Sequence, residues 1–329
     1  MPPRFEHGLF TLSLDFELVW GSRDLMDDPR PLVEAARVVR AEVFPGLLRM
    51  LSDLGIVATW ATVGHLFLAG ATERGGTLHP GHVPPRHAWR RSAWLEGVPA
   101  GTETSHPAYY ARSLVRQLRD AGQEVGCHSF THAIFGDPGC SRRTAESEVE
   151  RCVAVASELG IQLRSFVFPR NDPGHLDVIA RHGFTCWRGE EPAWYHHAAV
   201  PKPLRRAARL GSVALGTRPP AVLPFLDQHG LWCIPASDAF LPLEGLRRAI
   251  PLSRRVERGI AGIDHAVETG RIYHFWFHPI NLAPAPTAAL AGIRRILEHA
   301  ARRREAGDLE ILPMAAVAAR AQEVSGTNN

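Results

Sequence analysis

Short apolar runs that alternate with helical periodicities constrain this chain of 329 residues more than any other feature. Residues 10–14, 56–63, 124–127 and 272–277 are runs of strand length, and stretches with helical spacing, such as 32–54, separate them. Strands that alternate with helices indicate an α/β fold with a mainly parallel sheet. Because 45% of the residues are hydrophobic, the chain has enough apolar side chains to bury one large core.

Three stretches fall outside this alternation. Residues 69–107 are rich in Gly, Pro, Arg and His and follow the second expected strand, so they are predicted to form a long insertion over the surface. Residues 198–231 have no clear pattern, and 321–329 are predicted to be a frayed tail. We therefore expect a single domain over 1–329, with its core at about 8–318.

The composition limits the classes of partner. A formal net charge of +3 is too small to indicate nucleic acid. The five cysteines are odd in number and form no C-x-x-C pair, which argues against a disulfide framework. The sequence shows neither a signal-peptide segment nor an apolar run as long as a membrane span. We expect a cytoplasmic protein with a small-molecule partner and no membrane span.

Polar residues stand where the expected strands end. Asp15 ends the first strand, His278 ends a late one, and His128 and Arg170 each follow a strand. In α/β barrels the active residues gather at the carboxyl ends of the strands. The pattern therefore predicts one functional site to which these four residues contribute.

Two carboxylates, Asp15 and Glu17, lie two positions apart at the end of an apolar run. If the strand continues through them, both side chains lie on one face. Like charges held that close need a cation or a shared proton. The alternative is that the pair begins a solvated acidic loop.

Two histidines, His128 and His132, lie four positions apart in His-Ser-Phe-Thr-His. A helical turn or a tight loop brings such a pair to one side, where it can chelate one ion. Neutral imidazoles suit Zn²⁺ and the neighbouring transition metals. The alternative is chance, because the chain contains 17 histidines.

Two further segments have a structural and a chemical interpretation. Period two places His274, Trp276 and His278 on one strand face, and His278 is either a satisfied core residue or a general acid. Residues 168–172, Phe-Pro-Arg-Asn-Asp, form a turn by composition. That turn either only reverses the chain or aims backbone N–H groups and the Arg170 guanidinium at a developing oxyanion.

These blocks, in their order along the chain, resemble the polysaccharide deacetylases with a NodB-type domain (carbohydrate esterase family four). Residues 57–64, Val-Ala-Thr-Trp-Ala-Thr-Val-Gly, are similar to the second strand of that family. The resemblance extends from about Phe10 to His278 and rests most on the H-S-x-x-H block. It implies a distorted (β/α)7-type barrel, one divalent metal ion and amide hydrolysis.

The resemblance also implies roles for the matching residues. Asp15 matches the base of the family. Phe16 stands where the family has its acidic metal ligand, and Glu17 is the next carboxylate, so Glu17 is the expected ligand. The roles of Asp15 and Glu17 are open to exchange. The direct matches are the two histidine ligands, His128 and His132, and the histidine that protonates the leaving amine, His278.

The third block departs from the family pattern. Arg170 stands where the family has a tyrosine whose backbone N–H is an oxyanion donor, so that role falls to the Arg170 amide. Val167 takes the place of the arginine that braces the base, and Arg170 or Arg188 is the expected replacement.

The fourth block departs as well. The family has an Asp and a Trp in the region that corresponds to 186–194 here. The carboxylate that orients His278 is therefore open among Glu190, Glu191 and Asp238.

The function expected from these residues is metal-dependent removal of an N-acyl group, first of all N-acetyl, from a sugar or a sugar-containing precursor. One divalent ion is expected, with Zn²⁺ first and Co²⁺, Ni²⁺ or Mn²⁺ as alternatives. Two other functions stay open: hydrolysis of another non-peptide C–N bond, such as an amide or ureide of a small metabolite, and an inactive sugar-binding relic. The residues expected to contact the substrate are Trp89, Trp94, Arg188, Trp194 and Trp276.

Overall fold

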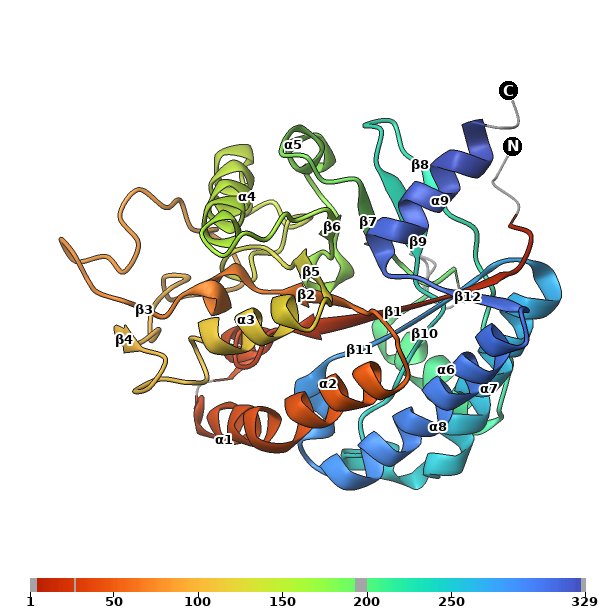
Figure 1. The fold of residues 1–329 in the computed structure, drawn as a ribbon. Helices are drawn as coiled ribbons and strands as arrows, with labels where there is room; N and C mark the ends of the chain where they lie inside the picture. The colour runs from red at the N-terminus through yellow and green to blue at the C-terminus, as the bar shows by residue number, and fades with distance from the viewer. Residues whose placement is uncertain (1–4, 27, 193–199, 327–329) are drawn as a thin grey trace.

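One large curled sheet lies at the centre of the protein in the computed structural model, which describes residues 5–26, 28–192 and 200–326 (Figure 1). Its strands are β1 (Gly8–Phe16), β2 (Thr59–Thr62), β5 (Glu124–Cys127), β6 (Ser165–Phe166), β7 (Cys186–Gly189), β8 (Phe225–Leu226), β9 (Trp232–Pro235), β10 (Asp238–Ala239), β11 (Ile272–Phe277) and β12 (Leu309–Ile311). Their order is β10-β11-β1-β2-β5-β6-β7-β9-β8, and β12 also pairs with β1. The neighbouring strands are parallel, except that β8 and β9 are antiparallel.

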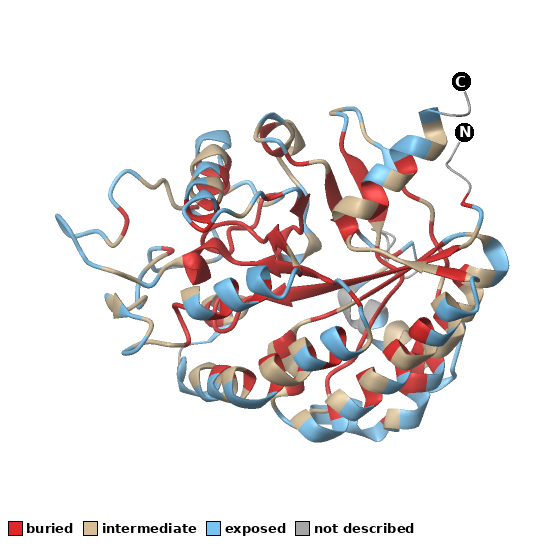
Figure 2. Cartoon of the chain, viewed as in Figure 1, coloured by how far each residue is buried: buried red, intermediate tan, exposed pale blue. Residues whose placement is uncertain are grey.

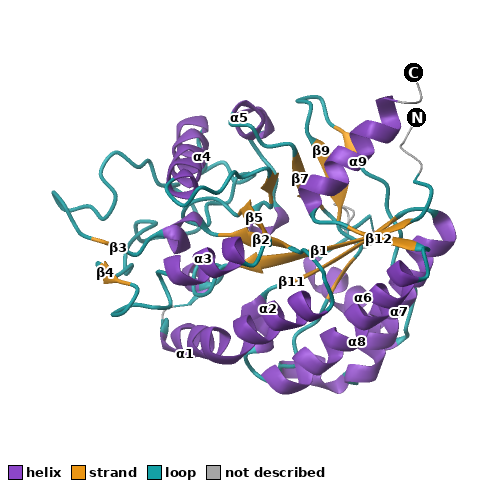
Figure 3. Ribbon diagram, viewed as in Figure 1, coloured by secondary structure: helices purple, strands orange, loops and turns teal. Residues whose placement is uncertain are grey.

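Helices surround this sheet (Figure 3). They are α1 (Arg30–Val38), α2 (Phe44–Asp53), α3 (Arg112–Asp120), α4 (Arg142–Ser157), α5 (Leu176–Arg181), α6 (Lys202–Ala214), α7 (Leu252–Thr269), α8 (Pro286–Glu305) and α9 (Met314–Gly326). A π-helical turn, Val39–Val43, joins α1 to α2. The predicted α/β class with a distorted, mainly parallel barrel is confirmed. None of the described helices is long and apolar enough to cross a membrane.

The central strand β1 is buried along its whole length (Figure 2). A parallel strand covered on both faces is expected to be almost continuously apolar, and β1 departs from this only on one face. Phe10, Leu12, Leu14 and Phe16 pack in the main apolar core. The alternate positions are on the opposite, concave face because successive side chains point to opposite sides of a strand. That face carries the buried polar residues Thr11, Ser13 and Asp15.

The C-terminal segment forms a helix, so the predicted frayed tail 321–329 is wrong up to residue 326. Helix α9 is held because Met314, Val317, Ala318 and Ala321 are buried in a second apolar cluster. That cluster includes Leu9 and Ile272, which lie at the amino ends of β1 and β11. Residues 327–329 lie outside the described part of the chain. Helix α9 therefore covers the amino ends of the strands.

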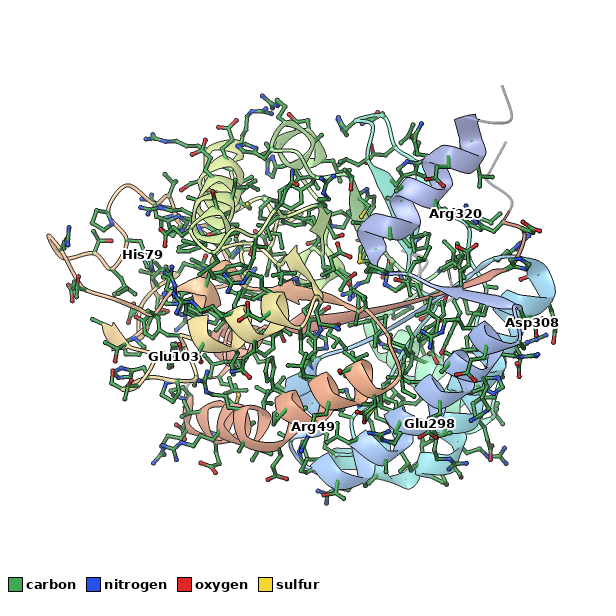
Figure 4. All side chains as sticks on the ribbon, in the orientation of Figure 1. Arg49, His79, Glu103, Glu298, Asp308 and Arg320 are labelled. Atoms are coloured by element: carbon green, nitrogen blue, oxygen red, sulfur yellow. The ribbon has the colours of Figure 1, made fainter. Side chains whose placement is uncertain are left out.

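Residues 69–107 contain little regular structure apart from a short antiparallel pair, β3 (Gly70–Ala71) and β4 (Gly101–Thr102). They lie on the left of Figure 1, on the side of the molecule away from α9 and the two termini. His79 and Glu103, both in this segment, are labelled on that side in Figure 4, whereas Arg320 of α9 lies opposite. The segment thus leaves the sheet at the carboxyl end of β2, as its place in the sequence predicts.

Candidate active site

The register of β1 and β11 brings two sequence-predicted site residues together. These strands are parallel neighbours, and Leu14 pairs with Phe277. The residues that follow, Asp15 and His278, therefore meet at the carboxyl ends of the two strands. The Nε2 atom of His278 lies 3.5 Å from Asp15 Oδ2 and 3.6 Å from Glu17 Oε1.

Glu17, His128 and His132 form a buried cluster whose arrangement suits a metal ion. Glu17 Oε2 lies 3.4 Å from His128 Nε2 and 3.2 Å from His132 Nε2. One ligand atom from each residue lies within 4.8 Å of the others, and the described part of the chain contains no second group of this kind. Glu17 Oε2 is buried without a hydrogen-bond partner among the described residues. Two imidazole nitrogens and a carboxylate oxygen are donors that suit a divalent cation such as Zn²⁺.

The backbone around His128 fixes which ring nitrogen faces this cluster. His128 Nδ1 lies 2.7 Å from the carbonyl oxygen of Val167. A carbonyl oxygen can only accept, so Nδ1 carries the hydrogen and Nε2 offers its lone pair to the cluster. Ser129 and His132 both have a left-handed backbone, with φ of 56° and 62°. Such conformations cost about 1–3 kcal/mol and tend to occur at functional sites.

Arg188 holds the carboxylate of Asp15 with two hydrogen bonds. Its Nη1 donates to Oδ1 at 2.6 Å and its Nη2 donates to Oδ2 at 2.7 Å. Nη1 also donates to Ser13 Oγ at 3.1 Å, and Nη2 to Asn171 Oδ1 at 2.9 Å. The guanidinium lies 4.2 Å from the centre of the Trp276 ring. Of the two arginines predicted to brace Asp15, Arg188 is the one in contact.

This contact also determines the charge state of Asp15. Burial raises the pKa of Asp15, but the positive charge of Arg188, and then that of His278, outweigh burial and hold the pKa below its ordinary value. The carboxylate is therefore ionised at neutral pH and able to accept a proton. Arg188 is only 2% exposed. Its guanidinium therefore binds Asp15 and is not open to a substrate, although the sequence predicted a substrate contact for Arg188.

Arg170 extends in another direction. Its guanidinium forms an ion pair with Asp24 and lies 4.9 Å from the centre of the Trp89 ring. Its backbone φ is 58°, in the left-handed region. The Arg170 side chain therefore joins the loop after β6 to residues 69–107 and does not brace Asp15.

The tryptophans predicted to contact a substrate have different surroundings. Trp89 is 44% exposed and stacks on His87, with ring centres 5.2 Å apart. Trp94 is buried, and its indole N–H donates to the carbonyl oxygen of Thr131 at 3.0 Å. Trp94 therefore anchors residues 69–107 to the loop that contains His128 and His132 (the histidine loop). Its burial leaves no open ring face on which a sugar could stack. Trp276 faces Arg188 as described above, and Trp194 lies outside the described residues.

The carboxylates that contact His278 are Asp15 and Glu17, which corrects the candidates chosen from the sequence. Asp238, one of those candidates, pairs instead with Arg258 at 2.9 Å. The imidazole also lies near the amide nitrogen of Asn281, 3.4 Å from Nδ1, and near the Trp276 ring, with ring centres 5.4 Å apart.

Sequence reasoning gave no role to two residues at this site, Ser13 and Asn171. Both accept hydrogen bonds from Arg188, and Ser13 Oγ also lies 2.9 Å from Nε2 of the buried His274. Period two along β1 places Ser13 on the same face as Asp15, so this one signal was present in the sequence. Nothing in the local sequence indicates the contact of Asn171.

The sequence model of the polysaccharide deacetylase family matches residues 31–187. The match includes the histidine pair and ends one residue before Arg188, whereas Asp15, Glu17 and His278 lie outside it. No curated protein matches the chain by sequence.

Solved structures share the fold at low sequence identity. A protein from Mycobacterium smegmatis described as a polysaccharide deacetylase has a TM-score of 0.63 at 13% identity, over 98% of this chain and 95% of the other. One from Pseudomonas aeruginosa PAO1 with the same description has a TM-score of 0.60 at 11% identity, over 94% and 89%. Puue allantoinase has a TM-score of 0.58 at 10% identity, over 94% and 88%. Residues 31–187 thus match the polysaccharide deacetylase family by sequence, and these solved structures share the fold of nearly the whole chain.

Proposed function

We propose that this protein is a metal-dependent hydrolase that removes an N-acetyl group from a sugar or a sugar-containing precursor. The observation that carries the proposal is the Glu17, His128 and His132 cluster with Asp15 and His278 beside it. We assign Glu17 and the two histidines as ligands of one divalent cation, with Zn²⁺ as the first choice. When bound, this cation supplies Lewis-acid chemistry toward the acyl oxygen and the attacking water.

Asp15 is the base in this mechanism. It is ionised and accepts a proton as water attacks the acyl carbon. Arg188 occupies one lone pair on each carboxylate oxygen, and each oxygen retains another that can accept the proton. The bidentate contact also fixes the plane of the carboxylate, so that the base does not rotate away from the water.

His278 is the acid, and the Arg170 amide is the donor to the developing oxyanion. The His278 side chain is 28% exposed beside the two carboxylates, so it can reach both solvent and substrate. As an imidazolium it gives its proton to the departing nitrogen. The Arg170 N–H donates in none of the backbone hydrogen bonds of the described residues, which leaves it available for an oxyanion.

The test is an acetate-release screen on N-acetylated sugars with the wild-type chain and an Asp15→Asn variant. The amide is nearly isosteric but a poor proton acceptor, so we expect kcat to fall by about 10²- to 10⁴-fold with metal content unchanged. Loss of the metal from the variant would exchange the roles of Asp15 and Glu17. Full activity of the variant would remove Asp15 from the base role.

A second candidate function is hydrolysis of another non-peptide C–N bond, an amide or ureide of a small metabolite. The fold likeness to Puue allantoinase supports this alternative. The same metal, base and acid serve both reactions. A panel of N-acetylated sugars and ureides, assayed in parallel for acetate and for ammonia or urea, separates the two by product.

We further propose that the chain is one domain in which residues 69–107 are an insertion. The buried Trp94 supports this assignment, because it ties the segment to the histidine loop. We propose a reducing, cytoplasmic setting as well, supported by five cysteines that are all buried and free.

A further inference from the structure

A cavity of about 560 Å³ lies between the loop after β1 and residues 69–107. Three arginines line it, namely Arg23, Arg90 and Arg91. Two aromatic residues, Trp89 and Tyr109, are also part of its wall. A cavity of this size accepts a small organic molecule or a part of a larger one.

The two acidic residues of the cavity are already engaged. Asp24 forms an ion pair with Arg170. Glu96 accepts the backbone N–H of Ala93 at 3.2 Å, and its side chain is exposed. Because three arginines share the wall with two carboxylates, one of which is paired with Arg170, the wall keeps an excess of positive charge.

Arg23 is the most unusual of the three cations. It is 9% exposed, its Nη2 donates to the Trp94 carbonyl at 2.5 Å, and its buried Nε has no partner among the described residues. Its guanidinium lies over the rings of Trp20 and Trp94, at 4.7 Å and 5.2 Å, instead of against a carboxylate. The negative charges of Asp24 and Glu148 act on Arg23, but no carboxylate of the described residues forms an ion pair with it. A buried charge without a paired carboxylate is costly.

Arg90 increases that cost. Its guanidinium lies 5.4 Å from the centre of the same Trp94 ring, and its own buried Nε has no partner among the described residues. Burial lowers the pKa of Arg23 to about 10, and the positive charge of Arg90 adds to this effect. Arg23 and Arg90 thus concentrate positive charge around one ring, which favours the binding of an anion nearby.

The cavity lies beside the candidate metal cluster. Its wall residues Asp24 and Trp89 contact the guanidinium of Arg170, and the next residue, Asn171, accepts a hydrogen bond from Arg188. Trp94, which carries both guanidinium groups, donates its indole N–H to Thr131, directly before His132. The cavity is therefore next to residues that contact the supports of Asp15 and His132.

We propose that this cavity binds an anionic group of the substrate, a phosphate or a carboxylate, through Arg23, Arg90 and Arg91. The inference rests on the proposed function and deepens it. It makes the substrate an N-acylated molecule that carries a phosphate or carboxylate group, instead of a neutral sugar. Guanidinium groups match the oxygen pairs of phosphate and carboxylate with paired N–H donors.

Direct anion binding tests the proposal without any turnover. Isothermal titration with inorganic phosphate, pyrophosphate and acetate is carried out on wild type, on Arg90→Gln and Arg91→Gln, and on Arg74→Gln. Arg74 is an exposed residue of the same segment outside the cavity, so Arg74→Gln is the matched control. We expect saturable binding that weakens about tenfold or more in Arg90→Gln and is unchanged in the control. The exposed Arg91 gives a second variant whose folding is not at risk.

Further arms separate the sources and the two proposals. Tighter binding of phosphate than of acetate assigns a phosphoryl group, and the reverse order assigns a carboxylate. The titration is repeated with the His128→Ala, His132→Ala double variant, in which retained binding places the anion in the cavity. Absence of saturable binding by every anion, equal affinities in Arg90→Gln and Arg74→Gln, or loss of binding in the double variant would each overturn the proposal. If anions bind but no acetylated sugar is cleaved, the function is wrong and the anion site stands.

Discussion

Glu148 of α4 accepts both hydrogen-bond donors of Thr131, the residue directly before His132. Its Oε2 accepts the Thr131 N–H at 2.7 Å, and its Oε1 accepts the hydroxyl at 2.5 Å. His82, from residues 69–107, places its Nε2 3.0 Å from the same Oε1. Glu148 is fully buried. Its carboxylate therefore connects α4 to the histidine loop and to residues 69–107.

This arrangement predicts that Glu148→Gln destabilises the fold in a pH-dependent way. Burial raises the pKa of Glu148, but the nearby His82 imidazole and the hydrogen bonds from Thr131 outweigh burial and hold the pKa below the ordinary value of 4.5. The unfolded chain then binds more protons than the folded one, so the stabilisation is present above pH 4.5 and is lost as the pH falls through the folded pKa. We expect a loss of roughly 1–3 kcal/mol at pH 7.

Thermal unfolding of wild type, Glu148→Gln and Glu150→Gln between pH 3 and pH 7 measures this effect. Glu150 is exposed on the same helix and serves as the control. The gap between wild type and Glu148→Gln should shrink as the pH falls below about 4.5. A gap that is constant over this range would show that the Glu148 charge does not contribute.

The cluster of Glu17, His128 and His132 predicts about one divalent ion per chain. Elemental analysis of the purified protein should find it, and the His128→Ala, His132→Ala double variant should lose it because one carboxylate is too weak a site. A double variant of His7 and His106, which lie outside the cluster, controls for the loss of two imidazoles. Full occupancy in the cluster variant would place the ion elsewhere.

Arg188→Gln is predicted to lower kcat strongly with little change in KM. Asp15 then lies buried without the guanidinium that holds both of its oxygens. Arg188→Lys should recover only part of the rate, since an ammonium group cannot make the paired contact. Arg170→Gln keeps the backbone amide and should retain far more kcat than Arg188→Gln, with unchanged metal content in all three. Equal losses in Arg170→Gln and Arg188→Gln would contradict the positioning role of Arg188.

His278→Ala is predicted to affect amides much more than activated esters. An amine leaves poorly without a proton, whereas the leaving group of an aryl acetate needs little help. The ratio of kcat/KM between an N-acetyl substrate and an aryl acetate should therefore fall sharply in the variant. Because both substrates report on the same preparation, partial unfolding lowers both equally. An unchanged ratio with metal and fold intact would recast His278 as a structural residue.

The contacts at the site differ in how far the sequence indicates them. Asp15 and Glu17 are two apart on one strand, so the period of a strand already places them together. The contact between Arg188 and Asp15 joins residues 173 positions apart. This contact depends on the curl of the sheet, which no local sequence pattern indicates. The sequence leaves the carboxylate partner of His278 open among Glu190, Glu191 and Asp238, whereas the register of β1 and β11 brings His278 to Asp15 and Glu17.

The fold shows the same division. The apolar runs 124–127 and 272–277 are strands β5 and β11 with the predicted bounds, and the helical spacing at 32–54 corresponds to α1, the π-helical turn and α2. Residues 198–231 had no readable pattern because α6 and β8 expose many of their side chains. Strand β10 has only two residues, Asp238–Ala239, and is too short for any periodicity. Helix α9 was missed because its alanines give a weak signal until the cluster around Leu9 covers them.

Val167 and Arg188 are next to one another across two strands. Phe166 pairs with Trp187 in the parallel ladder of β6 and β7, so the following residues lie at the same level of the sheet. The position at which the resembling family has its arginine is thus aliphatic here, and a guanidinium from the adjacent strand occupies the same neighbourhood. The guanidinium thus occupies the same place in the site, although it comes from a different position in the sequence. A comparison of aligned sequence positions will score this protein as lacking the arginine that holds the base. A comparison of the cations that contact the carboxylate of Asp15 will identify Arg188.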